Sequence, residues 1–206
     1  MISKYVFAFA LIFIMLPVLT FSQVRREKIF FDLNRSRHGS GDMEGLSIGL
    51  QYNRGLSKRF DWYGDLGFSM YDLSYQESNP NVGDETYEQR YVTAGLQIGG
   101  GVAYKPLAAK NEINIQLGPI LRYQSSSLAG SASTYYPDLT GLPMVVEHVK
   151  FYGEPLRTFN LGAKLRLGYS YVFTKGLLLG ANVYLQTDTY GDTIHGYGIT
   201  VGKRMN

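Results

Sequence analysis

The sequence has 206 residues, a formal net charge of +3 and no cysteine. Without cysteine the chain forms no disulfide, no thiolate metal site and no lipid-modified N-terminal cysteine. The modest charge, with no basic cluster interleaved with aromatic residues, argues against a nucleic-acid-binding protein.

Residues 1–22 have a composition of their own. Lys4 precedes an apolar stretch over residues 5–16, and Pro17 and Ser22 follow it. This order is typical of a secretory signal peptide. A retained helical anchor is the alternative, but the apolar stretch is shorter than the roughly 20 residues that span a bilayer as a helix. We therefore expect a cleaved signal over residues 1–22 and one domain over residues 23–206.

The rest of the chain alternates between apolar and polar residues in eight segments. The sixth, residues 158–173, is the clearest, because Leu161, Leu165 and Tyr169 share one parity while Asn160, Lys164 and Arg166 share the other. Side chains alternate between the two faces of a strand, so this run predicts one long β-strand between two unlike environments. The other seven segments are 28–34, 46–53, 62–70, 92–104, 113–123, 177–186 and 196–202. An even number of long strands predicts an all-β fold, an eight-stranded antiparallel up-and-down transmembrane barrel.

The polar parity decides which face points outward. It consists mainly of small residues with a few charges, which suits the inside of a narrow tube better than a water-facing surface. We expect lipid on the apolar face and a lumen lined by Asp65, Gln97, Gln116, Arg122, Lys164 and Arg166. Lys164 and Arg166 then need Asp32, Asp65 or water opposite them. A soluble lipocalin-type ligand-binding barrel, with its apolar face turned inward, is the alternative.

The connections alternate between short and long. Short ones are expected at residues 57–59, 105–111 and 174–176, and long ones at 36–43, 76–88 and 125–156, with a shorter connection at 187–193 on the long-loop rim. Aromatic residues, including Phe60, Trp62 and Tyr63, gather near the short turns and predict an interfacial belt. Within the longest loop, residues 145–151 predict either a hairpin arm above the membrane or a lid over the lumen.

In this pattern the chain resembles the OmpA-like and OmpX-like eight-stranded barrels of Gram-negative outer membranes. The resemblance implies an outer-membrane location, periplasmic termini, a monomer, insertion by the barrel assembly machinery, and contact with outer-membrane lipid and lipopolysaccharide. One difference is the C-terminus, which reads Lys203-Arg204-Met205-Asn206 where such barrels often end on an aromatic residue.

Function is less determined than fold. We expect a non-enzymatic envelope role, namely surface interaction, barrier integrity or a porin-like slow passage of one small solute. Some related barrels are lipid A hydrolases or acyltransferases that use His and Ser, so His195 is the weak catalytic candidate, but its strand has no neighbouring Ser. His38, His148 and His195 show no metal-ligand spacing on one strand, so neither metal nor cofactor is expected.

Overall fold

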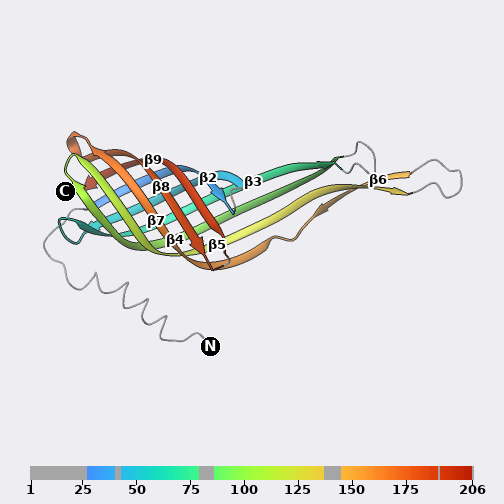
Figure 1. Ribbon diagram of the computed structural model, residues 1–206, viewed down its shortest axis with the longest axis horizontal. Coiled ribbons are helices and arrows are strands. Elements are labelled where there is room, and N and C mark those ends of the chain that lie inside the picture. Colours follow the sequence, from blue (N-terminus) through green and yellow to red (C-terminus); the bar gives the residue numbers. More distant parts are fainter. Residues whose placement is uncertain (1–26, 40–42, 79–85, 137–144, 190, 206) are drawn as a thin grey trace, which may run out of the picture.

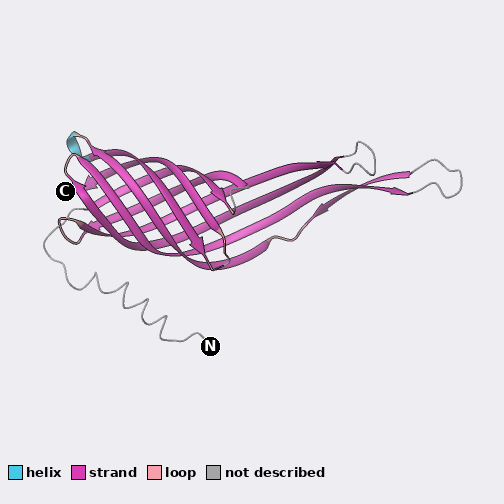
Figure 2. Ribbon diagram, viewed as in Figure 1, coloured by secondary structure: helices cyan, strands magenta, loops and turns pink. Residues whose placement is uncertain are grey.

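The computed structural model describes residues 27–39, 43–78, 86–136, 145–189 and 191–205. It shows a closed antiparallel barrel with two pairs of strands that project from one end (Figures 1 and 2). The expected signal peptide lies outside the described residues. The strands are β1 (Glu27–His38), β2 (Met43–Gly55), β3 (Phe60–Ser78), β4 (Thr86–Ala108), β5 (Asn111–Tyr136), β6 (Val145–Tyr152), β7 (Leu156–Val172), β8 (Leu177–Asp188) and β9 (Thr193–Met205).

Eight of these strands form the barrel wall, each paired with its neighbours. The order is β1, β2, β3, β4, β5, β7, β8 and β9, and β9 pairs back with β1 to close the ring. This confirms the predicted fold class. The ninth strand, β6, pairs with β5 only, beyond the barrel wall.

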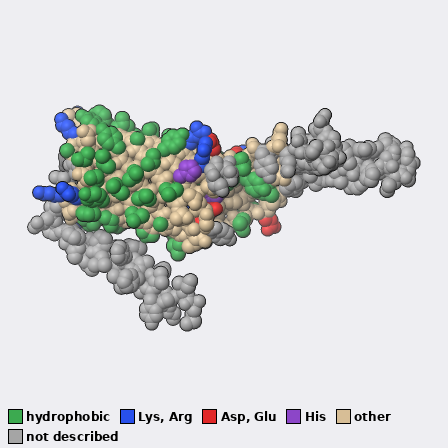
Figure 3. All heavy atoms as spheres, in the orientation of Figure 1, with side chains coloured by type: hydrophobic (Ala, Val, Ile, Leu, Met, Phe, Trp, Pro, Cys, Tyr) green, Lys and Arg blue, Asp and Glu red, His purple; other side chains and the backbone are tan. Residues whose placement is uncertain are grey.

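The two parities of each strand face opposite environments, as expected. In β7, Leu165 and Leu167 expose 43% and 46% of their surface, whereas the intervening Arg166 exposes 6%. The same alternation places Leu117, Ile199 and Leu33 on the outer face. Exposed hydrophobic side chains of this kind cover the visible side of the barrel in Figure 3, and we call the whole set of them around the barrel the apolar belt. An apolar exterior around a polar interior is incompatible with a soluble lipocalin-type barrel.

One predicted interfacial aromatic residue is placed differently. Tyr63 lies on the inward parity of β3 and is only 2% exposed, so it fills the lumen rather than facing lipid. Its neighbour Phe60 does lie outside, 44% exposed and 5.2 Å from Tyr104 between ring centroids. Residues 60–63 contain three aromatic residues close together, so the sequence did not reveal that Tyr63 lies on the opposite face from Phe60 and Trp62.

The expected turns are present at one end, and some are tighter than predicted. Strand β4 continues to Ala108 and β5 begins at Asn111, so two residues replace the predicted connection 105–111. At the same end a 3₁₀ turn, Thr174–Gly176, joins β7 to β8, with Lys175 and Gly176 at φ angles of 68° and 76°. Glycine accepts this left-handed backbone without steric cost. No helix among the described residues is long and apolar enough to cross a membrane.

The predicted long loop 125–156 is mostly strand. Residues Ala129–Tyr136 of β5 pair with the whole of β6, and Gly153 donates its N–H to the Leu128 carbonyl at 2.7 Å. Residues 145–151 therefore belong to a hairpin arm and not to a lid, since the arm points away from the barrel in Figure 1. The prediction of a loop was wrong because β5 continues beyond the apolar belt and stays hydrogen-bonded there to β6.

Strand β3 also continues past the barrel wall. Its pairing with β2 ends at Asp72, but its pairing with β4 runs on to Ser78, opposite Thr86. Strand β4 in turn pairs with β5 as far as Gln89 and Gly130. We call the four strands β3, β4, β5 and β6 beyond the barrel the projecting sheet. It stands on one side of the barrel only, and past Gln89 and Gly130 its β3–β4 and β5–β6 pairs separate (Figure 1).

Candidate functional site: a filled lumen and a projecting sheet

A buried ion pair crosses the middle of the lumen. Arg166 on β7 donates two parallel hydrogen bonds to Asp32 on β1, at 2.8 Å and 2.6 Å. The same guanidinium also donates to the Gln51 side chain and, at 3.1 Å, to the Thr200 hydroxyl. Thr200 completes the group by donating to Asp32 at 2.7 Å. Bidentate Arg–carboxylate geometry is the strongest form of such a pair, so this layer fixes opposite walls of the barrel.

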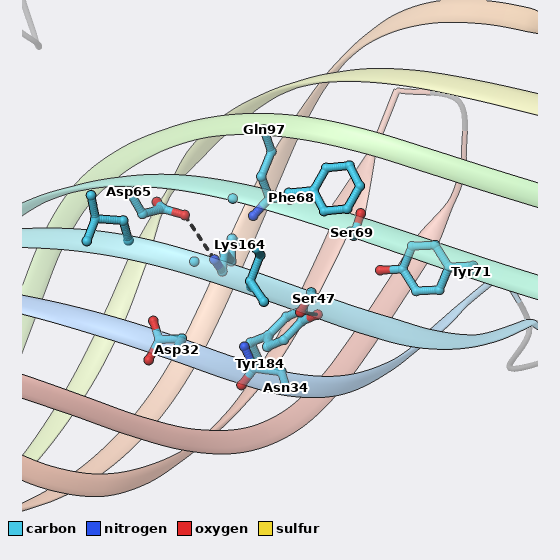
Figure 4. Close-up of a pocket in the computed structure, with 14 residues that line it drawn as sticks. Asp32, Asn34, Ser47, Asp65, Phe68, Ser69, Tyr71, Gln97, Lys164 and Tyr184 are labelled. Atoms are coloured by element: carbon cyan, nitrogen blue, oxygen red, sulfur yellow. Dashed lines mark hydrogen bonds and ion pairs between the residues drawn. The ribbon is translucent and has the colours of Figure 1, made fainter.

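A second pair lies beside a small cavity. Lys164 Nζ donates to Asp65 Oδ2 at 3.0 Å, and the ammonium stands 5.3 Å from the Tyr184 ring centroid (Figure 4). The cavity has a volume of about 20 Å³ and is lined by Lys164, Asp65, Gln97 and Ser47 among others. A volume of this size holds one or two water molecules. A cavity of this size admits water but no larger solute.

Glycines make room for these charged side chains. A Cβ added at Gly99 would stand 2.5 Å from Asp65 Oδ1, and one at Gly95 would stand 2.8 Å from Arg122 Nε. Both distances are shorter than real Cβ contacts allow. The run Gly99-Gly100-Gly101 thus serves close packing inside the barrel.

The short-turn end of the lumen is closed by further ion pairs. Glu112 on β5 accepts hydrogen bonds from Lys28 on β1 and Arg204 on β9. Beside them Lys105 Nζ donates to Asp61 at 2.5 Å, and both side chains are less than 5% exposed. Buried charges are tolerated when they are paired in this way.

Aromatic and apolar side chains close the opposite end. Tyr71, Tyr184 and Ile194 form a buried cluster on the inward face. Arg122 is 0% exposed, and its guanidinium carbon lies 5.9 Å from the centroid of the Tyr71 ring. None of its nitrogens has a hydrogen-bond partner among the described residues, but the Tyr71 ring and the carboxylates of Asp188 and Asp192 lie near enough to interact favourably with the guanidinium. We call Arg122, Tyr71, Tyr184 and Ile194 the outer plug.

The sequence did not single out three members of the outer plug. Tyr71, Tyr184 and Ile194 are large residues on the mainly polar inward parity of their strands. That departure is the signal that points to a lumen seal. The six predicted lumen residues all lie on the inward parity, where Asp65, Gln116, Arg122 and Arg166 are buried and Lys164 and Gln97 line the cavity.

The three histidines are not brought together. His38 lies inside the barrel mouth, with its Nε2 atom 3.2 Å from Asp192 Oδ2, whereas His195 is exposed on the outer face. The strand neighbours of His195 are Arg37 and Leu185, and no described residue gives it a serine partner. The side chain of His148 lies outside the described part. Within that part, no three His, Asp or Glu side chains are arranged to bind a metal ion.

The projecting sheet has several edges without a partner strand in the described residues. Its two outer edges are β3 from Leu73 to Ser78, and β6 together with Leu156–Asn160 of β7, because β8 pairs with β7 only from Gly162 onward. Between them, β4 from Thr86 to Glu88 and β5 from Ser131 to Tyr136 are not paired with each other. The hydrogen bond from Gly153 to Leu128 sets which backbone groups point outward. Since the direction alternates along an antiparallel strand, the N–H and C=O groups of Val146, His148, Lys150 and Tyr152 face away from β5.

An eight-stranded closed barrel with an apolar exterior, a polar filled lumen and short turns at one end is the fold of the small outer-membrane barrel proteins. No protein-family model matches the chain, and no curated protein is similar to it in sequence. The outer membrane protein OprG from Pseudomonas aeruginosa is similar in structure, with a TM-score of 0.51 at 10% identity, covering 89% of this chain and 97% of that chain.

Two further structures are more distant. The attachment invasion locus protein Ail of Yersinia pestis has a TM-score of 0.49 at 10% identity, over 88% of this chain and 99% of that chain. The outer membrane enzyme PagL has a TM-score of 0.40 at 14% identity, over 85% and 99% of the two chains. Likeness at these identities concerns the fold alone.

Proposed function

We propose that the protein is a non-enzymatic outer-membrane protein that binds extended segments of partner proteins along the free edges of its projecting sheet. The signal peptide is removed on export, the short turns and both termini face the periplasm, and the sheet stands outside the cell. The observation that carries the proposal is the unpaired edge formed by β6 and the start of β7.

Free strand edges can template pairing with another chain, so stable proteins usually protect them by short length, charge, proline or a covering segment. The edge of β6 offers backbone donors and acceptors at every second residue from Val146 to Tyr152, and the edge continues at Arg157 and Phe159 of β7. An added strand would satisfy these groups, which is the mode of recognition called β-augmentation. Main-chain hydrogen bonds would supply affinity, and side chains beside the edge would supply selectivity.

Two substitutions of Lys150, one to proline and one to alanine, test the edge directly. Peptides selected from a random library against the protein in lipid nanodiscs should bind the edge, and Lys150→Pro should weaken them about tenfold, since a lost hydrogen bond and a strand clash cost roughly 1–2 kcal/mol. Proline removes an N–H that points away from β5, so the β5–β6 ladder stays intact. Lys150→Ala is the matched control, because it alters the same side chain and keeps the N–H.

Equal binding by Lys150→Pro and the unaltered protein would show that the peptides bind elsewhere. A loss with Lys150→Ala equal to that with Lys150→Pro would assign the effect to the side chain and refute edge pairing. The hydrogen exchange of the Lys150 amide, which should slow on peptide binding, gives an independent readout.

The filled lumen supports a role without transport. Ion-pair layers and the outer plug leave a cavity of about 20 Å³, so planar bilayers containing the protein should show no stable open channel. A steady conductance would contradict this part of the proposal. Lipid A mass spectra of cells with and without the protein should be identical, and a changed acyl pattern would favour the hydrolase or acyltransferase alternative.

A further inference from the structure

The outward face of the barrel carries a compact basic patch where the apolar belt ends. Along β1 the outward residues are Ile29, Phe31 and Leu33, which are 39%, 50% and 42% exposed, and then Arg35 and Arg37. A Lys or Arg on the lipid face costs about 2–4 kcal/mol at the middle of the bilayer and about 0–1 near its surface. The change from leucine to arginine therefore marks the level at which the hydrocarbon ends on this wall.

Strand pairing places two further residues beside the arginines. His195 of β9 is the direct partner of Arg37, and Tyr197 of β9 is the direct partner of Arg35. Directly opposed residues on one face have Cβ atoms about 4.5–5.5 Å apart. His195 is exposed and Tyr197 is 59% exposed. We call these four residues the arginine face; Figure 3 shows basic and histidine side chains gathered at the edge of the apolar belt.

The arginine face has more positive than negative charge. Both arginines share a single carboxylate, since Arg35 donates to Glu44 and Arg37 donates to it at 3.0 Å and 2.6 Å. The hydrogen bonds from Arg35 and then Arg37 hold the pKa of Glu44 below its usual value, so it stays ionised. One charge remains uncompensated. The side chains of Arg35 and Arg37 are still 58% and 52% exposed, which leaves guanidinium surface available to a ligand.

Apolar surface lies beside and below the arginine face. Arg35 pairs with Leu46 of β2 and His195 pairs with Leu185 of β8, so these two leucines lie beside it, and Leu33 lies next below Arg35 on the same face. Leu46 and Leu185 are 61% and 49% exposed. A molecule bound here therefore meets cationic and aromatic side chains at its head and aliphatic side chains along its tail.

The barrel wall that carries the arginine face ends soon after the apolar belt. Residues 39–42 are all that join β1 to β2, and residues 189–192 join β8 to β9, whereas the opposite wall continues into the projecting sheet. The arginine face is thus on the side from which the sheet does not rise.

We propose that the arginine face binds the phosphorylated sugar head of a glycolipid in the outer leaflet, with the acyl chains of that lipid against the neighbouring leucines. Guanidinium groups bind phosphate through paired N–H donors, and an exposed tyrosine at the interface contributes an apolar ring and a hydroxyl. The head of such a lipid lies at the end of the hydrocarbon, which is the level of Arg35 and Arg37. This site is independent of the edges of the projecting sheet.

The test compares two forms of one lipid. The protein is placed in phospholipid nanodiscs with either bis-phosphorylated lipid A or the same lipid A after removal of both phosphates, and retained lipid is titrated by native mass spectrometry. The phosphorylated form should bind, and loss of the phosphates should weaken it about tenfold or more, since hydrogen bonds to charged groups contribute roughly 1.5–3 kcal/mol each.

Variants locate the site. Arg35→Ala/Arg37→Ala should reduce binding of phosphorylated lipid A to the level of the dephosphorylated form. Lys203→Ala removes an exposed cation on the same outward parity at the other end of β9, and it should leave binding unchanged. Glu44→Gln removes the competing carboxylate, so its binding should be equal or tighter.

Equal binding of both lipid forms by the unaltered protein overturns the proposal, and that result needs no variant to fold. A loss with Lys203→Ala as large as that with the double arginine variant would also overturn it, because the effect would then follow total charge rather than this face.

Discussion

The two walls of the barrel end differently, although one hydrogen-bonded ladder runs through both. On the low wall, made of β8, β9, β1 and β2, the strands stop within a few residues of the apolar belt and present arginines outward. On the high wall, made of β3, β4, β5 and β7, pairing continues beyond the belt into the projecting sheet. The comparison teaches that strand length beyond the belt, and not the barrel itself, separates the lipid-facing surface from the strand edges that we propose bind partners.

The largest expected effect comes from the pair that joins the two walls. Asp32 lies on the low wall and Arg166 on the high wall, both less than 10% exposed. Asp32→Ala leaves the guanidinium buried without its carboxylate and should lower the free energy of unfolding by about 3–5 kcal/mol. Urea titration of the refolded protein in lipid vesicles, followed by tryptophan fluorescence, measures this change.

The double variant Asp32→Ala/Arg166→Met is the control for that experiment. It removes both charges, so it should be more stable than Asp32→Ala alone. If the two variants were equally unstable, the pair would not be what holds the walls together.

The next effect concerns the lipid face of the high wall. Leu165→Arg places a charge in the apolar belt and should cost about 2–4 kcal/mol, with a lower yield of membrane insertion. Gln97→Arg points the same charge into the lumen, beside Asp65, whose Oδ1 atom has no hydrogen-bond partner among the described residues. Folding yields in vesicles, read from heat-modifiable mobility on gels, should therefore be lower for Leu165→Arg, and equal yields would contradict the face assignment.

The smallest effect is expected from removing the arm of the high wall. Deletion of residues 129–153 leaves Ser126 paired with Leu156 and replaces the arm by a short turn. Since the arm contributes nothing to the lumen layers, the free energy of unfolding should change by about 0.5 kcal/mol or less, as for other surface changes. Binding of lipid A at the arginine face should be unaffected, whereas edge-binding peptides should be lost. A barrel that fails to fold without the arm would mean that the two regions are not separable.

Much of this organisation could be predicted from the sequence, and the exceptions have physical causes. Alternation identified the eight barrel strands and their outer face, because a one-residue slip would expose lumen charges to lipid. It also placed Asp32 or Asp65 opposite Lys164 and Arg166, and the structure pairs each cation with one of them.

The projecting sheet and the outer plug could not be predicted in the same way. Residues 125–136 alternate poorly between apolar and polar residues, so only the pairing of β5 with β6 reveals a strand there. Tyr71 and Tyr184 are aromatic residues on an inward face, and periodicity alone does not distinguish a plug from an interfacial belt. The arginine face could not be predicted either, because only the register of β1 and β9 shows that Arg35 lies beside Tyr197.

The ion pairs of Glu112 also bear on how the barrel assembles. Lys28 belongs to the first strand and Arg204 to the last, and both bind a carboxylate on the strand in the middle of the chain. These bonds join residues 84 and 92 positions apart, and pairing of β1 with β9 brings the two ends of the chain together. Contacts so distant in sequence form late, after the local hairpins. We therefore expect the Glu112 cluster to form after the hairpins, when β1 pairs with β9, so that its formation would distinguish the closed barrel from a sheet that is still open.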